Sequence, residues 1–212
     1  MKHKIIGIKN YTDSVFELSV ERNGLEFEPG QYIMVSKPGL KEKREYSIYS
    51  STDAEFLELL IKDVDGGDVS GALHRSQIGE ELDIEGPLGT FTIPKEIRNG
   101  KFVLIATGTG IAPFHSFVTS YPELDYKLLH GVREPEQLYG KESFDSSRHV
   151  ECLTRNVNGH FNGRVTDYLR QNSVEVSSYY YLCGSSDMIY ESFEILQSKG
   201  VARNHLLTEI YF

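Results

Sequence analysis

The stretch KFVLIATGTGIAP, residues 101–113, joins a short apolar run to a glycine-rich turn. The run Lys101–Ala106 predicts a fully buried strand. The turn that follows leads into a helix expected from about Pro113 to Ser120. Its glycines allow a ligand to approach the backbone, and the helix start offers free N–H groups to a diphosphate. Because the spacing is not GxGxxG, a plain strand-to-helix turn remains the alternative.

The rest of the second half alternates strands with helices. Buried strands are predicted at Tyr126–His130, Val150–Thr154 and Tyr179–Cys183, and helices at Val165–Gln171 and Asp187–Ser198. This alternation predicts a parallel α/β sheet.

The first hundred residues have the pattern of a β domain. Strands are predicted at Ser14–Val20, Gln31–Val35, Tyr46–Ser50, Phe56–Val64 and Glu81–Ile84, with turn signals at Asn23-Gly24, Pro29-Gly30, Gly66-Gly67 and Gly86-Pro87, and one short helix at Ser70–Ser76. Short strands at this spacing indicate a small antiparallel barrel or sandwich. Arg98-Asn99-Gly100 is a plausible linker, so we expect domains at 1–98 and 99–212.

Composition and charge limit the possible functions. The 212 residues carry a net charge of −9, which argues against general nucleic-acid binding. No apolar run approaches the roughly 18 residues that span a bilayer, and no signal peptide is recognisable, so a cytoplasmic protein is expected. Cys152 and Cys183 lie 31 residues apart without a CxxC pattern, which argues against a disulfide framework, a zinc site or an iron–sulfur cluster. We therefore expect no metal.

Three other motifs could bind a ligand. Arg44-Glu45-Tyr46-Ser47 offers a guanidinium for phosphate, a flat ring and a hydroxyl, although taken alone the tetrad favours an ordinary strand start over a site. Gly66–Gly71 (GGDVSG) precedes a short helix, which is also the pattern of an ordinary helix cap. The terminal stretch 208–212, TEIYF, ends in two aromatic residues, which suggests docking; core packing explains it equally well.

The order of these motifs resembles the ferredoxin–NADP reductase family, and within it the compact bacterial type, over essentially the whole chain. The resemblance implies a Greek-key antiparallel β-barrel that binds FAD, followed by a parallel α/β domain that binds NADP(H). It also implies that Arg44 contacts the FAD diphosphate, that Tyr46 covers one face of the isoalloxazine, and that Ser47 lies near flavin N5.

Further residues are assigned by the same resemblance. Ile61 and Lys62 lie on the strand whose backbone passes the flavin, and Gly67, Val69 and Ser70 belong to the Gly-x-x-Ser motif at the FAD diphosphate. In the nucleotide domain, the diphosphate loop contains Thr107, Gly108, Thr109, Gly110, Ile111 and Pro113. Cys183 and Gly184 line the nicotinamide pocket. Tyr211 stacks on the second flavin face, and Phe212 extends the chain beyond it.

The preference for NADP(H) rests on basic residues in the second domain. Thr154-Arg155 resembles the Ser-Arg pair of NADP-dependent members, and Arg164 and Arg133 match further basic positions. A planar guanidinium suits a dianionic phosphate. The alternative is three solvated surface arginines.

The implied activity is hydride transfer between NADP(H) and FAD and electron transfer to a small carrier, a ferredoxin or flavodoxin, by a monomer. Ser47, Cys183, Glu209 and Tyr211 are the predicted catalytic residues. Because the chain is acidic, docking an acidic carrier requires a local basic face, or else the partner is different. An alternative is an NADH-dependent reductase component serving an oxygenase or a haem protein. A second alternative is a flavin-binding sensor or interaction domain without turnover, against which the Cys-Gly pair and the terminal Glu-x-Tyr argue.

Overall fold

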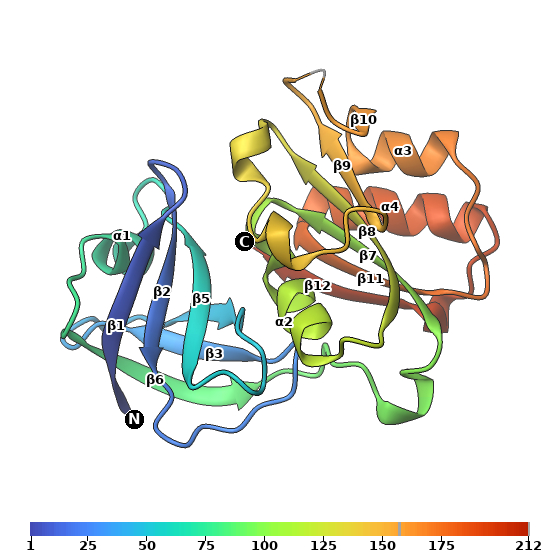
Figure 1. The fold of residues 1–212 in the computed structure, drawn as a ribbon. Coiled ribbons are helices and arrows are strands. Elements are labelled where there is room, and N and C mark those ends of the chain that lie inside the picture. The colour runs from blue at the N-terminus through green and yellow to red at the C-terminus, as the bar shows by residue number, and fades with distance from the viewer. Residues whose placement is uncertain (157, 212) are drawn as a thin grey trace.

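The first six strands form an antiparallel sheet that closes into a barrel (Figure 1). The computed structural model describes residues 1–156 and 158–211. The strands are β1 (Lys2–Asn10), β2 (Val15–Glu21), β3 (Tyr32–Ser36), β4 (Arg44–Ser47), β5 (Phe56–Lys62) and β6 (Glu81–Leu88), in the order β4-β3-β6-β1-β2-β5. A bridge between Ile48 and Leu59 joins the two ends of this order. The predicted antiparallel barrel is therefore confirmed.

The barrel is filled by alternate residues of its strands. Phe16, Leu18 and Val20 of β2 are fully buried, as period-two patterning requires. The short helix α1 (Asp68–His74) adds Val69 and Leu73 to the same core. Apolar alternation in β2 was thus sufficient to predict this strand.

Two features of the barrel differ from the sequence prediction. Strand β1 was not predicted, although Lys2 and Lys4 face solvent while His3 and Ile5 are buried. The turn expected at Gly86-Pro87 is wrong, because β6 continues through it to Leu88. A register shift in the β3–β6 ladder accommodates this segment, so the pairing resumes beyond it.

The second sheet is parallel throughout its paired strands. Its strands are β7 (Lys101–Thr107), β8 (Asp125–Val132), β9 (His149–Leu153), β10 (Phe161–Asn162), β11 (Tyr179–Ser185) and β12 (Leu206–Tyr211), in the order β10-β9-β8-β7-β11-β12. This confirms the parallel α/β sheet. Strands β10 and β12 were not predicted as strands; β12 is the terminal segment for which only docking was expected.

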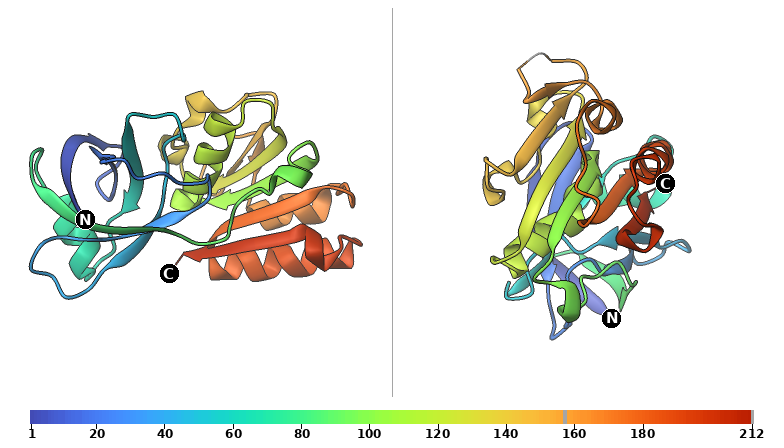
Figure 2. Two further views of the ribbon diagram at one scale, coloured as in Figure 1. Left: turned by 90° about the horizontal axis from the view of Figure 1, so that it is seen from below. Right: turned by 90° about the vertical axis from the view of Figure 1, so that its right-hand side faces the viewer.

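Helices cover both faces of this sheet (Figure 2). Helix α2 (Ala112–Ser120) packs on one face through Phe114 and Phe117. Helices α3 (Val165–Gln171) and α4 (Ser186–Ser198) pack on the other. The short 3₁₀ segments are η1 (Lys95–Ile97), η2 (Gly108–Ile111), η3 (Pro135–Gln137), η4 (Lys141–Ser143) and η5 (Arg203–His205).

Helix α2 also fastens the parallel sheet to the barrel. The Ser116 hydroxyl donates to the Ser50 carbonyl at 2.8 Å, and both groups are buried. The His115 ring stacks on Tyr49 at 3.8 Å between centroids, and its Nδ1 contacts the Tyr49 carbonyl at 2.7 Å. A carbonyl only accepts, so Nδ1 carries the proton; burial lowers the pKa of His115 and keeps the ring neutral. One apolar core therefore continues from the barrel into α2.

Candidate functional site

The predicted nucleotide residues gather at the carboxyl ends of the parallel strands. Thr107 ends β7, and Arg133, Thr154 and Arg164 follow β8, β9 and, after one residue, β10. Cys183 and Gly184 lie near the end of β11, paired with Glu209 and Ile210 of β12. This is the edge at which open α/β sheets bind ligands.

A chain of hydrogen bonds crosses from the barrel to the last strand. The Tyr211 hydroxyl donates to Ser47 Oγ at 2.6 Å, and the Ser47 hydroxyl donates to Glu209 Oε1 at 2.5 Å. Ser47 is buried at the end of β4, whereas Glu209 and Tyr211 are half-buried on β12. Three of the predicted catalytic residues are thus in direct contact although two domains supply them.

The surroundings of these hydrogen-bonded residues raise the pKa of Glu209 and of the neighbouring Cys183. Burial raises the pKa of Glu209 to about 7, the negative charge of Glu45 adds to this, and the Ser47 hydrogen bond opposes it. Burial also raises the pKa of Cys183 well above its usual range, and the neighbouring Glu209 charge adds to it. Cys183 is therefore a neutral thiol, unsuited to nucleophilic attack. Glu209 is the group of this cluster that can exchange a proton near neutral pH.

Arg44 and Tyr46 occupy successive positions on one side of β4. Arg44 is exposed and forms an ion pair with Glu42, Nη2 to Oε2 2.8 Å. Tyr46 is half-buried against the barrel core, and burial raises its pKa. Arg44 is therefore accessible to an anion that competes with Glu42, while Tyr46 presents a ring beside Ser47.

The motif before α1 is held mainly by contacts within the barrel. Ser70 Oγ accepts from the Val64 N–H at 3.1 Å and donates to Asp63 Oδ1 at 3.3 Å. A Cβ at Gly67 would lie 2.6 Å from Ser70 Oγ, so a side chain does not fit there. The side chains of Val69 and Ile61 are buried in the barrel core.

The surface beside this motif is an open groove of about 400 Å³. It is lined by Leu40, the segment Asp63–Asp68, Gly71, Ala72 and Arg75. Lys62 is exposed next to it. The three aspartates of the groove disfavour an anion close to their carboxylates, so a diphosphate here would depend on backbone N–H groups and on the guanidinium of Arg75.

The glycine-rich turn fits tightly against the neighbouring strand. A Cβ at Gly110 would lie 2.4 Å from the Cys183 carbonyl oxygen. Gly184 has φ +136, and a Cβ there would lie 2.2 Å from Thr107 Oγ1, which accepts from the Ser185 N–H at 3.2 Å. Gly110, Ile111 and Pro113 are buried; the half-exposed part of the turn is 107–109. Thr107, Gly108 and Thr109 are therefore the residues of this loop that a ligand can reach.

The basic residues predicted for NADP(H), called here the arginine cluster, follow the three adjacent strands β8, β9 and β10. Arg133, Arg155 and Arg164 are all exposed, and within 1–156 and 158–211 none of them forms an ion pair. The Arg155 N–H donates to the Arg133 carbonyl at 3.1 Å, which keeps the ends of β8 and β9 together. The Thr154 hydroxyl is directed at the Val132 carbonyl at 3.4 Å. Three unneutralised guanidinium groups suit a dianion.

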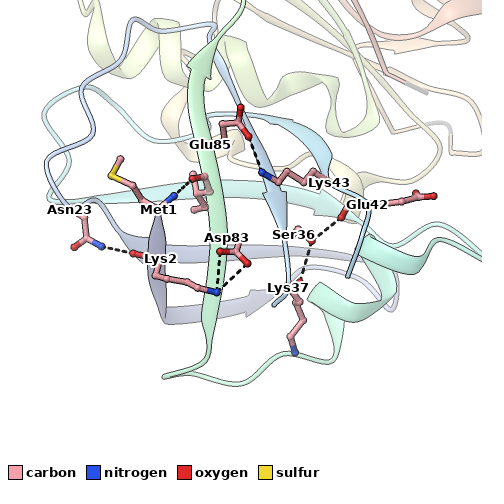
Figure 3. Close-up of polar contacts among 10 residues, drawn as sticks. Met1, Lys2, Asn23, Ser36, Lys37, Glu42, Lys43, Asp83 and Glu85 are labelled. Carbon is pink, nitrogen blue, oxygen red and sulfur yellow. Dashed lines mark hydrogen bonds and ion pairs between the residues drawn. The ribbon is translucent and has the colours of Figure 1, made fainter. Parts of the chain in front are cut away.

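Cations on the barrel are paired near the N-terminus. Figure 3 shows Lys2 bound to Asp83 at 3.0 Å and Lys43 bound to Glu85 at 2.8 Å. The amino group of Met1 donates to a β6 carbonyl at 2.6 Å. This corner of the barrel therefore presents neutralised pairs and not a basic face for an acidic partner.

Sequence reasoning did not find every residue that shapes the site. The interdomain pair of Tyr49 and His115 carried no motif, since an aromatic residue and a histidine in separate segments are common. His130, which contacts the glycine-rich turn, was predicted only as the last residue of the strand Tyr126–His130. Phe212 lies outside the described residues. In the described part of the chain, no cluster of metal-ligating side chains is present, and no helix has the length and apolarity to cross a membrane.

Comparison with known proteins gives related domains in the same order. Residues 2–93 match the family model of the oxidoreductase FAD-binding domain, and residues 104–192 match that of the oxidoreductase NAD-binding domain. A propane 2-monooxygenase reductase component of Rhodococcus jostii is 30% identical over 88% of the chain, but the chain spans only 56% of that protein. A ferredoxin–NADP reductase of Azotobacter vinelandii is 27% identical over 93% of the chain and 89% of its own length.

Solved structures share the fold. A ferredoxin NADP⁺ reductase from Neisseria gonorrhoeae with bound FAD and NADP superimposes with a TM-score of 0.90 at 24% identity, covering 100% of this chain and 98% of its own. An Amycolatopsis cytochrome P450 reductase superimposes at 0.86 with 23% identity, covering 99% of this chain and 69% of its own.

Proposed function

The chain belongs to the ferredoxin–NADP reductase family, and from this we propose that it transfers a hydride between NADP(H) and FAD and exchanges electrons with a small carrier protein, a ferredoxin or flavodoxin. The observation that carries the proposal is the hydrogen-bonded chain of Tyr211, Ser47 and Glu209. When bound, FAD supplies the hydride chemistry and the one-electron steps. The protein supplies binding, alignment and proton control.

The residues around this chain fit an FAD. Tyr46 precedes Ser47 on β4, and Tyr211 of the last strand donates to Ser47, so both rings belong to this site. Arg44 offers an accessible guanidinium for a phosphate. Gly67 precedes α1 at a position where Ser70 Oγ leaves no space for a side chain. Ile61, Lys62, Val69 and Ser70 would act through their backbone or their position, since three of these side chains are buried.

Glu209 is the proton-holding group in this proposal. With a pKa of about 7, its carboxyl can hold or release a proton near neutral pH. The Ser47 hydroxyl fixes the carboxyl by donating to Oε1. The buried, neutral Cys183 lies beside Glu209 on the paired strand and forms part of the wall of the site.

The order of the strands supports a proposed position for each part of the nucleotide. Strands β8, β9 and β10 carry the arginine cluster, β7 carries the glycine-rich turn, and β11 and β12 carry Cys183 and Glu209. An extended dinucleotide would have its 2′-phosphate at Arg133, Arg155 and Arg164, its diphosphate at 107–113, and its nicotinamide at Cys183-Gly184. This supports NADP(H) over NAD(H).

Stopped-flow reduction of the FAD-loaded protein by NADPH and by NADH tests the proposal. We expect faster reduction at low concentrations of NADPH, and we expect Arg155→Ala to raise the KM for NADPH about tenfold or more while changing that for NADH little, because a charge-assisted contact is lost. An equal effect on both nucleotides contradicts the NADP(H) assignment. A protein that stays colourless after incubation with FAD contradicts the flavoenzyme as a whole.

A second candidate is an NADH-dependent reductase component of an oxygenase. It is favoured by relatives whose names are reductase components of propane 2-monooxygenase and an electron transfer component of toluate 1,2-dioxygenase. Preference for NADH in the same stopped-flow experiment, followed by electron transfer to an oxygenase and not to ferredoxin or flavodoxin, would select it. We further infer a cytoplasmic monomer with its domain boundary at residues 98/99, which size-exclusion chromatography and limited proteolysis would examine.

A further inference from the structure

His130 is a buried histidine that contacts the glycine-rich turn. It lies on β8, opposite Ala106 of β7, and its side chain is fully buried. Its Nε2 is 3.0 Å from the Gly108 carbonyl oxygen. Because a carbonyl only accepts, Nε2 carries the hydrogen and the ring is held in one tautomer.

The ring is neutral under all ordinary conditions. Burial lowers the pKa of His130 to about 3; the hydrogen bond to Gly108 opposes this, and the nearby His149 adds to it. Nδ1 has no partner among the described residues. The single polar contact found for this ring in the described structure is therefore directed at the turn.

That contact determines how the turn is oriented. In a trans peptide, the carbonyl of Gly108 and the N–H of Thr109 lie in one plane and point in opposite directions. Since the carbonyl points to the buried ring, the Thr109 N–H points away from it. Thr109 is half-exposed at the start of η2, where the first N–H groups have no partner within the helix.

We propose that His130 is a positioning residue for the diphosphate of the nicotinamide nucleotide. By holding the Gly108 carbonyl inward, it keeps the Thr109 N–H free and directed outward to donate to the diphosphate. Gly108 has φ +53, a conformation that few other residues adopt and that allows this peptide orientation. The inference rests on the proposed function, and it concerns the diphosphate only; the 2′-phosphate belongs to the arginine cluster.

Three substitutions separate this role from a merely structural one. In His130→Gln the amide nitrogen reaches approximately to the position of Nε2, so the donor is kept. In His130→Asn the same amide stops near the position of Nδ1 and cannot reach Gly108. His130→Leu removes the donor altogether. Asn and Gln are thus a matched pair of equal polarity and different reach.

The measurements are made on the full-length FAD-loaded protein. We expect the Kd for NADP⁺ and the KM for NADPH to rise about tenfold in the Asn and Leu variants and less than about threefold in the Gln variant, with kcat nearly unchanged. Binding of adenosine 2′-monophosphate, which has no diphosphate, should stay unchanged in all three, whereas Arg155→Ala should weaken it.

Several results would overturn the inference. Equal NADP⁺ affinities for the Asn and Gln variants would do so, as would a matching loss of adenosine 2′-monophosphate binding. If the variants do not fold, nitrogen-15 NMR of the wild-type protein decides, since a His130 ring protonated at Nδ1 and not at Nε2 contradicts the contact. Failure of the proposed function is distinguishable, because the wild-type protein would then bind neither NADP⁺ nor adenosine 2′-monophosphate.

Discussion

Replacing Glu209 by glutamine should make the protein more stable, and increasingly so as the pH rises. Glu209 has an ordinary pKa of 4.5 when unfolded and of about 7 in the folded protein. Between these values the folded state holds a proton that the unfolded state has released. Raising the pH therefore favours unfolding, and this loss is complete once the pH exceeds 7.

The magnitude follows from the two pKa values. Each pH unit between them is worth about 1.4 kcal/mol, so Glu209 lowers the free energy of unfolding by about 3 kcal/mol at high pH. Between pH 5 and pH 8 the change is about 2.5 kcal/mol by the same relation. Glutamine does not titrate, yet its amide oxygen still accepts from the Ser47 hydroxyl. The difference between Glu209→Gln and the wild type should therefore grow by this amount.

Urea unfolding at pH 5, 6, 7 and 8, followed by circular dichroism at one FAD concentration, measures this difference. Other titrating groups are present in both proteins and cancel. Glu194→Gln, on the exposed side of α4, is the control for replacing a carboxylate. A Glu209→Gln difference that stays constant from pH 5 to 8 refutes the reasoning, because it means that Glu209 titrates in the folded protein as it does in the unfolded chain.

Three further predictions concern single contacts. Ser47→Ala removes the hydroxyl between Tyr211 and Glu209, and flavin reduction by NADPH should slow on the order of tenfold with little change in KM; an unchanged stopped-flow rate contradicts the role. Gly110→Ala should lower the free energy of unfolding by about 3 kcal/mol or more, because its Cβ would lie 2.4 Å from a backbone carbonyl oxygen. Gly108→Ala has open space around its Cβ but a φ of +53, so it should cost only about 1 kcal/mol. Equal melting temperatures of the two variants contradict this prediction. Burial lowers the pKa of His149 to about 4, so the folded protein loses free energy of unfolding as the pH falls below 6.5. His149→Phe should reduce this loss between pH 7 and pH 5 by about 2 kcal/mol. An acid unfolding transition that the substitution leaves unaltered contradicts this prediction.

The parts of the fold that were predictable are those whose signal is local. The apolar run of β7 followed by glycines, and the alternation in β2, specify strands within a few residues. Strand β12 gave no such signal, because its pattern LLTEIY mixes apolar and polar residues and its stability comes from pairing with β11. Strand β6 was shortened in the prediction because Gly-Pro normally marks a turn, whereas a register shift against β3 at this segment lets the strand continue through it.

The site was less accessible to local reasoning. Ser47 and Glu209 are 162 positions apart, and nothing in either segment specifies the other. The family resemblance could assign Ser47 and Glu209 to one site, because it rests on the order of the motifs along the chain. It could not supply the pKa of Glu209, which depends on burial created by the whole fold, or the contact from His130 to Gly108, which depends on the register of β8 against β7.

The hydrogen bonds of the site depend on the relative position of the two domains, and α2 makes contacts that fix this position. Its N-terminal end continues from the glycine-rich turn, whereas the body of the helix binds the barrel through His115 and Ser116. The barrel in turn supplies Ser47. A rotation of the parallel sheet about α2 would therefore change the 2.5 Å distance from Ser47 to Glu209. Burial of His115 as a neutral ring, and the continuous core around it, oppose such a rotation. The geometry proposed for hydride transfer thus depends on the interface, and the residues that fix it lie outside the motifs that identify the family.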